Sequence, residues 1–492
     1  NNLARALRAQ KKYAEAIDIL NSKLPYHPNS SEMHNILGGL YVDLHDLQNA
    51  IECFKKANKL DPTFADAFFN LGGALFLISE FEEAIKAFEK AKIAGFEKAK
   101  SFNNIGLCQR QLGCIEDAII SYKFALNMTG NEIPEAYSTL VNLGNAYADQ
   151  KNWRASILNY NMAIKCKNDQ PEAYINLGKA HASLKEHSIA IRFFEQALKI
   201  EPSSYEAEYE MGLSLAALGK FVAAGRSFDA VLQIVPTHIK ALIAQGINYK
   251  KIENYELAKI CFESAIKQSP EDQHGALLHL ASMGFEQLPN KTPDHYLKNF
   301  YREKAKVWGQ PGNKGYRGHK PIAAALTKIQ ADAKVDVILD MGCGTGSLGT
   351  LINPFCRSLV GVDISADMLA RASESSHYDI LHEQSLEEHL FENTNKYDTI
   401  IAAAVLIHFN DLDPIFSLVK SSLVQRGVFI FSIFESDSED VKLNSLLMYE
   451  HNQKYISKLA EKHDFEVIFE ERALHEKNDK GEFFGLSYGM RN

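Results

Sequence analysis

Small and aromatic residues recur at fixed intervals through the first half of the chain. Glycines recur at intervals of 34, 34, 38, 34, 34 and 34 residues: Gly38, Gly72, Gly106, Gly144, Gly178, Gly212 and Gly246. Twelve residues after each glycine comes a small residue: Ala50, Ala84, Ala118, Ser156, Ala190, Ala224 and Ala258. Four residues further on comes an aromatic residue: Phe54, Phe88, Tyr122, Tyr160, Phe194, Phe228 and Phe262. A fixed period of this length is typical of an array of stacked supersecondary units.

Each unit is predicted to be a pair of antiparallel helices. The small residues let the two helices approach closely, and we expect the aromatic residue to fill the gap between neighbouring pairs. A proline ends the second helix of several units, because it lacks the N–H donor that a helix needs: Pro62, Pro202, Pro236 and Pro270. The 38-residue interval between Gly106 and Gly144 is four residues longer than the others, and we expect a loop at residues 129–134 to account for the difference. Residues 271–284 predict a capping helix, and residues 287–293 predict a linker.

This pattern resembles the tetratricopeptide repeat (TPR). Seven units cover about residues 31–270, and a half-repeat precedes them. The resemblance implies an α-solenoid of TPR helix pairs, whose concave groove holds a peptide or a partner protein. Dimerisation and packing on the neighbouring domain are the alternatives. Asparagines recur on the first helices, where they either bind a peptide backbone or face solvent: Asn35, Asn70, Asn103, Asn104, Asn142, Asn145 and Asn176.

From Val335 onward, short apolar segments alternate with amphipathic ones. This alternation predicts a parallel sheet with helical crossovers, that is, an α/β domain. We expect parallel strands at residues 335–340, 358–362, 380–381, 397–404 and 427–434. Antiparallel edge strands are expected at residues 465–470 and 483–490.

A glycine-rich loop follows the first of these strands. The strand runs into Met341-Gly342-Cys343-Gly344-Thr345-Gly346, where glycines allow a tight turn and a close approach of the backbone to a ligand. The second strand ends in Asp363, which is placed to accept both hydroxyls of a ribose. A dinucleotide fingerprint would need glycine at position 347, which is Ser347. Asp340 stands just before the loop, and its carboxylate suits an ammonium group. S-adenosylmethionine (SAM) is therefore favoured over a dinucleotide.

The order of these residues resembles motif I of class I SAM-dependent methyltransferases, which have a Rossmann-like fold. The whole chain looks like bacterial predicted methyltransferases that carry TPRs before the catalytic domain. The resemblance implies this cofactor-binding set: Asp340, Gly342, Cys343, Gly344, Thr345, Gly346, Asp363, Ile364, Ser385, Leu386, Ala403, Tyr316 and Arg317. The family often has Asp where this chain has Ser385 and Ala404, and these departures put both contacts in doubt.

Three residues are candidates for catalysis. His408 follows the fourth strand, where it serves either as a general base or as a structural histidine. Tyr316 belongs to the aromatic and basic segment 294–320, interpreted as a lid over cofactor and acceptor or as an ordinary linking helix. His451 and Tyr455 are four residues apart, and on one helical face they form a candidate acceptor pocket.

Composition narrows the partners. The chain has 492 residues and a net charge of −9, which disfavours non-specific binding of nucleic acid. Its apolar runs are too short to span a membrane. Seven scattered cysteines without a C-x-x-C pair argue against a metal site and fit the cytoplasm. Because the sequence begins with Asn1-Asn2 rather than with Met, it leaves open whether a targeting segment precedes it.

We therefore expect three parts: a TPR solenoid with its capping helix at residues 1–284, a linker and lid at 285–325, and a methyltransferase domain at 326–492. The first functional hypothesis is a SAM-dependent methyltransferase whose repeats recruit a protein or peptide. The second is a small-molecule or glycan methyltransferase whose array binds a partner or forms a homodimer. The third is an interaction scaffold with a regulatory or inactive methyltransferase-like domain.

Overall fold

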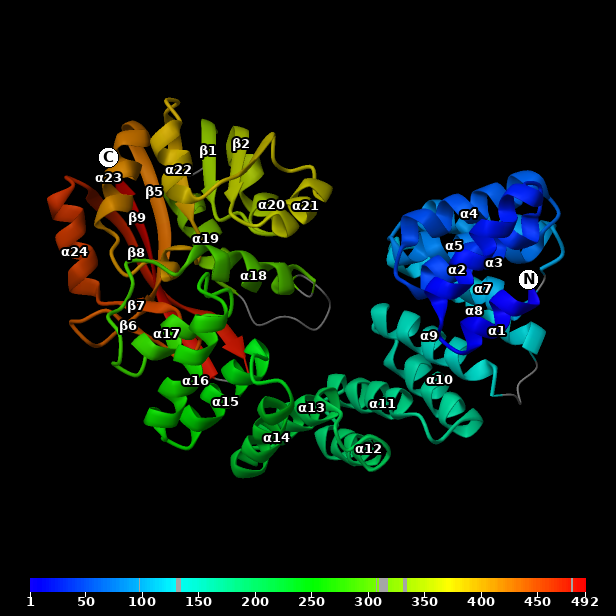
Figure 1. Cartoon of the computed structure of the whole chain (residues 1–492). Helices are drawn as coiled ribbons and strands as arrows, with labels where there is room; N and C mark the ends of the chain where they lie inside the picture. The colour runs from blue at the N-terminus through cyan, green and yellow to red at the C-terminus, as the bar shows by residue number, and fades with distance from the viewer. Residues whose placement is uncertain (97, 130–133, 307, 309–316, 331–333, 479–480) are drawn as a thin grey trace. The chain divides into compact units, whose positions relative to one another are not determined.

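A computed structural model describes residues 1–96, 98–129, 134–306, 308, 317–330, 334–478 and 481–492. These residues divide into two compact units, Asn1–Val235 and Pro236–Asn492. Figure 1 shows the first unit as helices and the second as helices followed by a sheet. Within the described ranges, none of the helices is both long and apolar enough to cross a membrane.

The first unit consists of antiparallel helix pairs. It opens with α1 (Asn2–Ala9), α2 (Tyr13–Lys23) and the 3-10 turn η1 (Leu24–Tyr26), so a helix precedes the expected half-repeat. The first helices of the following pairs are α3 (Ser31–Asp43), α5 (Ala65–Leu77), α7 (Ala99–Gln111), α9 (Ala136–Asp149), α11 (Pro171–Ser183) and α13 (Tyr205–Ala217). Their second helices are α4 (Leu47–Leu60), α6 (Phe81–Ile93), α8 (Ile115–Thr129), α10 (Trp153–Cys166), α12 (His187–Ile200) and α14 (Phe221–Ile234).

The repeated glycine and the repeated aromatic residue form one contact inside each pair. A Cβ atom added to Gly38 would lie 2.6 Å from the Phe54 ring, and one added to Gly144 would lie 2.4 Å from the Tyr160 ring. The same contact occurs in every repeat. The aromatic side chain therefore packs on the glycine of its own pair. The missing glycine side chain provides the space for the ring. The ring also shares a core with the next pair, Phe54 with Leu71 and Tyr160 with Leu177, as we expected of a residue that fills the gap between neighbouring pairs.

The recurring asparagines bond to one another along the first helices. The Asn70 side-chain amide donates to Asn35 Oδ1 at 2.9 Å, and the Asn142 amide donates to Asn103 Oδ1 at 3.0 Å. The Asn176 amide donates to Asn145 Oδ1 at 3.2 Å. These half-buried side chains are thus partly satisfied by neighbouring repeats rather than by solvent alone.

The second unit begins with the last helix pair of the array. This pair comprises α15 (Ile239–Lys251) and α16 (Tyr255–Gln268). The capping helix that follows, α17 (Ala276–Ala281), is shorter than expected, because Gly275 adopts a φ of +76° and the Asp272 carboxylate accepts the N–H groups of Ala276 and Leu277. Two further helices precede the sheet: α18 (Asp294–Ala305) and α19 (His319–Gln330).

The described strands of the second unit form one mixed sheet. Its main path is β3-β2-β1-β4-β5-β7-β6, and β9 pairs antiparallel with both β5 and β8. The strands are β1 (Val335–Met341), β2 (Cys356–Asp363), β3 (Ile380–Glu383), β4 (Tyr397–Ala402), β5 (Leu423–Glu435), β6 (Lys442–Leu443), β7 (Tyr449–His451), β8 (Glu466–Asn478) and β9 (Gly481–Arg491). The expected parallel strands are confirmed, and both expected antiparallel strands are present, with β8 much longer than predicted. β9 is not an edge strand, however, because it lies between β5 and β8.

Helices cover both faces of this sheet. The connecting elements are α20 (Gly349–Ile352), η2 (Asn353–Phe355), α21 (Ala366–Glu374), α22 (Leu386–Glu392), η3 (Leu406–His408), α23 (Asp413–Ser422) and α24 (Gln453–Lys462). Apolar residues of α22, α23 and α24 share one core with Leu339 and Met341 of β1, whereas α19 and α20 share another core with Ile338. Because both faces are covered, the central strands are apolar on both sides, as parallel strands in α/β domains are. The chain is thus an α-solenoid followed by an α/β domain.

Candidate functional site

A cavity of about 960 Å³ opens at the carboxyl ends of the central strands of the second unit. The loops after β1, β2, β3 and β4 line it, together with α18. Open parallel sheets bind ligands at this edge, where neighbouring strands lead into loops. Its volume lies at the upper end of the ~300–1,000 Å³ that is usual for ligand sites.

The glycine-rich loop after β1 adopts a conformation that requires glycine. Gly342, Gly344 and Gly346 have φ values of +71°, +55° and +78°. A Cβ atom on Gly342 would lie 2.7 Å from Val405, whereas a Cβ atom on Gly344 would meet no atom within 4 Å. The backbone at Gly344 therefore faces open space, and a ligand can approach it closely.

Asp340 lies directly before this loop and is 1% exposed. Its Oδ2 accepts the Tyr378 hydroxyl at 2.7 Å, and its Oδ1, which is buried, has no hydrogen-bond partner in the described structure. Burial raises the pKa of this carboxyl to about 7. A buried carboxylate oxygen without a partner is costly, and a cationic ligand would satisfy it.

Asp363 ends β2 and binds the glycine loop. Its Oδ2 accepts the Gly344 N–H at 2.9 Å, and its Oδ1 accepts the Ser365 N–H at 2.9 Å. Burial raises the pKa of Asp363 to about 6, although these backbone N–H groups oppose the rise. Each oxygen retains a lone pair that is not used by these bonds, so that the carboxylate can also accept ligand hydroxyls.

The third and fourth strands contribute short side chains and backbone. Ser385 caps α22: its hydroxyl accepts the Glu388 N–H at 3.2 Å, and its own N–H donates to the Glu388 carboxylate at 3.0 Å. Gln384 lines the cavity beside it, and no sequence motif pointed to this amide. After β4, Ala404 has a φ of +53° and its N–H donates to Ser432 Oγ at 2.9 Å. The wall therefore has no carboxylate at either position where the resembled family often has one.

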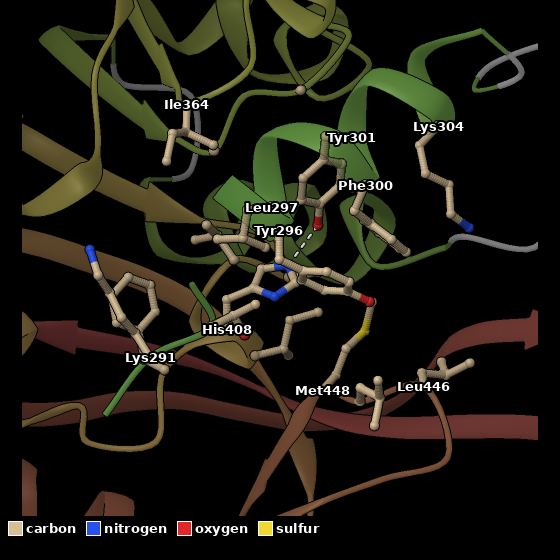
Figure 2. Close-up of a pocket in the computed structure, with 18 of the residues that line it drawn as sticks. Lys291, Tyr296, Leu297, Phe300, Tyr301, Lys304, Ile364, His408, Leu446 and Met448 are labelled. Carbon is tan, nitrogen blue, oxygen red and sulfur yellow. Dashed lines mark hydrogen bonds between the residues drawn. The ribbon is translucent and has the colours of Figure 1, made fainter. Parts of the chain in front are cut away.

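His408 and Tyr301 form a pair in the wall of the cavity. His408 Nε2 lies 2.7 Å from the Tyr301 hydroxyl, and the two rings meet edge to face (Figure 2). Burial lowers the pKa of His408 to about 4, so that its imidazole is neutral at pH 7. Sequence reasoning placed Tyr301 in the lid segment but assigned it no role.

Helix α18 presents aromatic side chains to the same cavity. Figure 2 shows Tyr296, Phe300 and Tyr301 on this helix around His408. The Arg371 guanidinium of α21 donates to the backbone carbonyls of Ala305 and Trp308, the latter at 2.8 Å. These bonds hold the C-terminal end of α18 beside the loop that follows β2.

Tyr378 is a further residue that sequence reasoning missed. An added Cβ atom would lie within 3.1 Å of its ring at each of Gly346, Gly349 and Gly361, and its hydroxyl orients Asp340. The available signal was Gly361, because a glycine inside a strand marks a close approach of another group.

Most of the residues expected to bind the cofactor line the cavity together. They are Asp340, Gly342, Cys343, Gly344, Thr345, Asp363, Ile364, Ser385, Leu386 and Ala403. Gly346 does not line it and packs on Tyr378 and α21. Arg317 is exposed, and its backbone N–H donates to His475 O. Tyr316 lies outside the described residues, as do the lid glycines at positions 309, 312 and 315.

The structure does not bring His451 to the cavity. It lies on β7 rather than on a helix, so the expectation that it shares a helical face with Tyr455 is wrong. The two rings nevertheless stack at 5.7 Å between centroids. His451 is fully buried, and its Nε2 lies 3.3 Å from the Asn410 carbonyl oxygen. These contacts indicate a role in packing the β7 edge.

Family comparisons match the two parts of the chain separately. A family model described as "Methyltransferase domain" matches residues 315–474. Models described as "TPR repeat" or "Tetratricopeptide repeat" match residues 1–20, 38–79, 144–185, 171–204 and 239–272. The chain therefore carries tetratricopeptide repeats in its N-terminal part and a methyltransferase domain in its C-terminal part.

Relatives match only part of the chain. The "Ubiquinone biosynthesis O-methyltransferase" of Glaesserella parasuis is 28% identical over 147 residues, covering 28% of this chain and 60% of that protein. The "Malonyl-[acyl-carrier protein] O-methyltransferase" of Acetivibrio thermocellus is 34% identical over 112 residues, covering 22% and 39%. A solved structure titled "YrrB: a TPR protein with an unusual peptide-binding site" is 25% identical, with a TM-score of 0.33, covering 40% of this chain and 97% of that one. The chain thus spans less than two thirds of the length of these curated relatives.

Proposed function

We propose that this chain is a SAM-dependent methyltransferase whose helical array recruits a protein or peptide. One observation carries the proposal. Two buried carboxylates, Asp340 and Asp363, flank a loop of three positive-φ glycines at the mouths of adjacent strands. Asp340 Oδ1 has no partner among the described residues, and Gly344 faces open space. An adenosyl ligand with positive charges and ribose hydroxyls fits this combination.

The residues of the cavity fit this cofactor chemically. Asp340 would hold a cationic part of SAM, Asp363 its ribose hydroxyls, and the wall formed by Ser385, Leu386 and Ala403 its base. SAM would supply a methyl group on a positively charged sulfur: the lone pair of an acceptor bonds to the methyl carbon in line, and the sulfur leaves with the electrons of the broken C–S bond. The protein then has to orient the acceptor, remove its proton and exclude water.

His408 is the residue that we assign as general base. Its imidazole is neutral at pH 7, because burial lowers its pKa, and it lines the cavity next to the first strands. The Tyr301 hydroxyl already occupies Nε2 at 2.7 Å. An acceptor hydroxyl or ammonium therefore passes its proton to His408 through Tyr301. A positioned general base contributes ~10²–10⁴-fold in rate and is most effective when its pKa lies near the operating pH, so the pKa of about 4 places His408 at the low end of this range.

Helix α18 excludes water from this site. Its aromatic side chains form one wall of the cavity, and Arg371 anchors its C-terminal end. Closing such a wall strengthens the electrostatic interactions inside the site and prevents side reactions. We propose that α18 acts as a lid, which moves to admit the cofactor and the acceptor.

The helical array is proposed to bind a protein or peptide. Tetratricopeptide repeats generally mediate protein interactions, and the paired asparagines of the first helices support this role. The side-chain amides of Asn70, Asn142 and Asn176 each have two N–H groups, and the pairing uses one of them. The second N–H can donate to a peptide carbonyl without requiring a particular sequence.

The seven cysteines are free thiols, in keeping with a cytoplasmic location.

Calorimetric titration of the full chain with SAM, and with NAD as a control ligand, tests the cofactor. We expect saturable binding of SAM and none of NAD. Gly344→Asp should abolish SAM binding, because the added carboxylate enters the open space at the glycine loop and the φ of +55° disfavours a residue with a side chain. Circular dichroism checks that the variant is folded. Gly284→Asp is the matched control, since Gly284 also has positive φ (+80°) and no atom within 4 Å of an added Cβ. A folded protein that fails to bind SAM would instead favour the scaffold hypothesis.

A further inference from the structure

The cavity extends beyond the glycine loop into a region that we call the chamber. Its walls come from three elements besides α18: Phe434 at the end of β5, Leu446 and Met448 before β7, and Ile247 of α15. Figure 2 shows Leu446 and Met448 facing Tyr296 and Phe300 across this space. The chamber is therefore apolar and partly aromatic, and α15 belongs to the last tetratricopeptide repeat.

Lysines give this chamber a positive charge. Lys250 and Lys251 of α15 and Lys304 of α18 line the cavity. Lys304 Nζ lies 5.3 Å from the Phe300 ring centroid, and neither Lys251 nor Lys304 forms an ion pair within the described residues. Both lysines are thus placed to bind an incoming anion.

The carboxylates of the wall lie mostly away from Lys251 and Lys304 or pair with another lysine. Asp340 and Asp363 lie at the glycine loop, whereas Asp294 and Glu387 both pair with Lys291 at 3.1 Å. Glu476 of β8 is the further carboxylate among the described lining residues. Lys251 and Lys304 against this one carboxylate make this part of the cavity cationic.

The lysine pair is specific to the last repeat. The equivalents of Lys250 in the six preceding units are Val42, Phe76, Arg110, Ala148, Ala182 and Ala216, and those of Lys251 are Asp43, Leu77, Gln111, Asp149, Ser183 and Ala217. A lysine at the end of a helix can simply stabilise the helix dipole. All seven first helices have that dipole, however, and only the one that lines the cavity carries two lysines.

We infer that the methyl acceptor is an apolar organic anion, and that the last repeat forms part of its binding site. The acceptor's apolar body would fill the chamber between α18 and Met448, while its carboxylate or phosphate group binds Lys251 and Lys304. The part of this inference that identifies the ligand as the methyl acceptor rests on the proposed function. The anion site itself is independent of the cofactor.

Two fluorescent probes with the same ring skeleton test the charge. 8-Anilinonaphthalene-1-sulfonate carries a sulfonate, and N-phenyl-1-naphthylamine lacks it. We expect the full chain to bind the sulfonate at least tenfold more tightly at low salt. Lys251→Gln/Lys304→Gln should remove most of this preference without changing the affinity for the neutral probe. The matched control is Lys240→Gln/Lys267→Gln, because both lysines are exposed on α15 and α16 and neither lines the cavity.

Two further results decide the location and the dependence on cofactor. Met448→Trp fills the chamber and should weaken both probes, so sulfonate binding that survives it unchanged would overturn the inference. Equal binding of the two probes by the unmodified chain would also overturn it. The Gly344→Asp variant should lose SAM binding and retain the sulfonate preference. If the unmodified chain binds SAM but does not prefer the sulfonate probe, only the anion site is contradicted. If it prefers the sulfonate probe but does not bind SAM, only the cofactor site is contradicted.

Discussion

Two carboxyl groups at the mouths of β1 and β2 give the site its electrostatic character. Burial raises the pKa of Asp340 to about 7 and that of Asp363 to about 6. Near neutral pH, the protein therefore holds groups that gain from ionising when a cation arrives. Perturbed carboxyl groups inside a cavity are characteristic of functional sites.

Affinity for SAM should depend on pH through these groups. A cationic ligand favours the ionised carboxylates, so that affinity falls as protonation proceeds below pH 7. We expect the dissociation constant measured by calorimetry to decrease by ~10-fold between pH 5.5 and 7.5 and to level off above pH 8, a change worth about 1.4 kcal/mol. Asp340→Asn should flatten the upper part of this curve. An affinity that is constant from pH 5.5 to 8.5 would contradict the role of both carboxylates.

The same burial should make Asp340 a cost to stability. Its pKa in the folded protein lies above the ordinary value of 3.8, so the penalty is full above pH 7 and disappears below about pH 4. Asp340→Asn removes this charge and should raise the Tm of the second unit by ~3 °C or more at pH 8. The gain should vanish at pH 4. A lower Tm at pH 8, measured by circular dichroism, would show that the carboxylate stabilises the fold.

At the scale of the element, each helix pair turns through one residue with positive φ. In successive repeats these are His45, Ser79, Gly113, Lys151, Lys185, Gly219 and Glu253. Two repeats already have glycine at this position, and in the others an L side chain adopts the left-handed conformation at a cost of ~1–2 kcal/mol. The backbone of each turn without glycine therefore carries a small strain, which recurs along the array.

Ser79→Gly should relieve this strain. Ser79 is exposed and has a φ of +65°, and its backbone N–H donates to Phe76 O at 3.0 Å. We expect urea unfolding of a fragment of residues 1–235 to show a gain of ~0.5–1 kcal/mol. Ser79→Ala is the control, because alanine keeps the Cβ atom and should give no gain. Equal stability of the two variants would argue against backbone strain at this turn.

Most elements could be predicted from the sequence, because their signals are local. A 34-residue period specified the helix pairs, and apolar runs ending in Gly342 and Asp363 specified the first strands. The contact of Gly38 with Phe54 was not predicted, since spacing alone does not say whether a ring packs within a pair, between pairs or both. His451 was placed on a helix because residues four apart can share one helical face. The same spacing fits equally well where a strand, a capping residue and the start of a helix follow one another.

The contacts between distant segments of the site could not be predicted in this way. Tyr301 and His408 are 107 residues apart, and Tyr378 and Asp340 are 38 residues apart. Neither tyrosine belongs to a motif. The sequence suggested the polar groups that flank the cofactor loop, whereas the groups that orient them depend on how α18 and the segment before β3 pack.

At the scale of the whole molecule, the last tetratricopeptide repeat belongs to the compact unit that contains the cavity. The boundary between the units falls at Val235, not at the end of the array. Tyr296 of α18 packs on Gly275, where an added Cβ would lie 2.7 Å from its ring, and the Asn299 amide donates to Gln273 O at 3.0 Å. The segment that follows the repeat therefore supports the helix that covers the site.

Two fragments test this division. A fragment of residues 236–492 should unfold cooperatively and bind SAM as the full chain does. A fragment of residues 285–492 lacks α15–α17 and exposes the apolar side of α18, so its Tm should be lower by ~5 °C or more. Thermal unfolding followed by circular dichroism compares them. Equal Tm values would show that the last repeat does not stabilise the methyltransferase domain.

Hydrogen–deuterium exchange of the full chain, with and without saturating SAM, tests the central claim most directly. The account predicts slower exchange in peptides that contain the glycine loop at residues 341–347 and the strand ends at 363–365 and 384–387. It predicts no change in residues 1–235. Protection confined to other regions, or saturable SAM binding that leaves the glycine loop unprotected, would contradict the assignment of this cavity as the cofactor site.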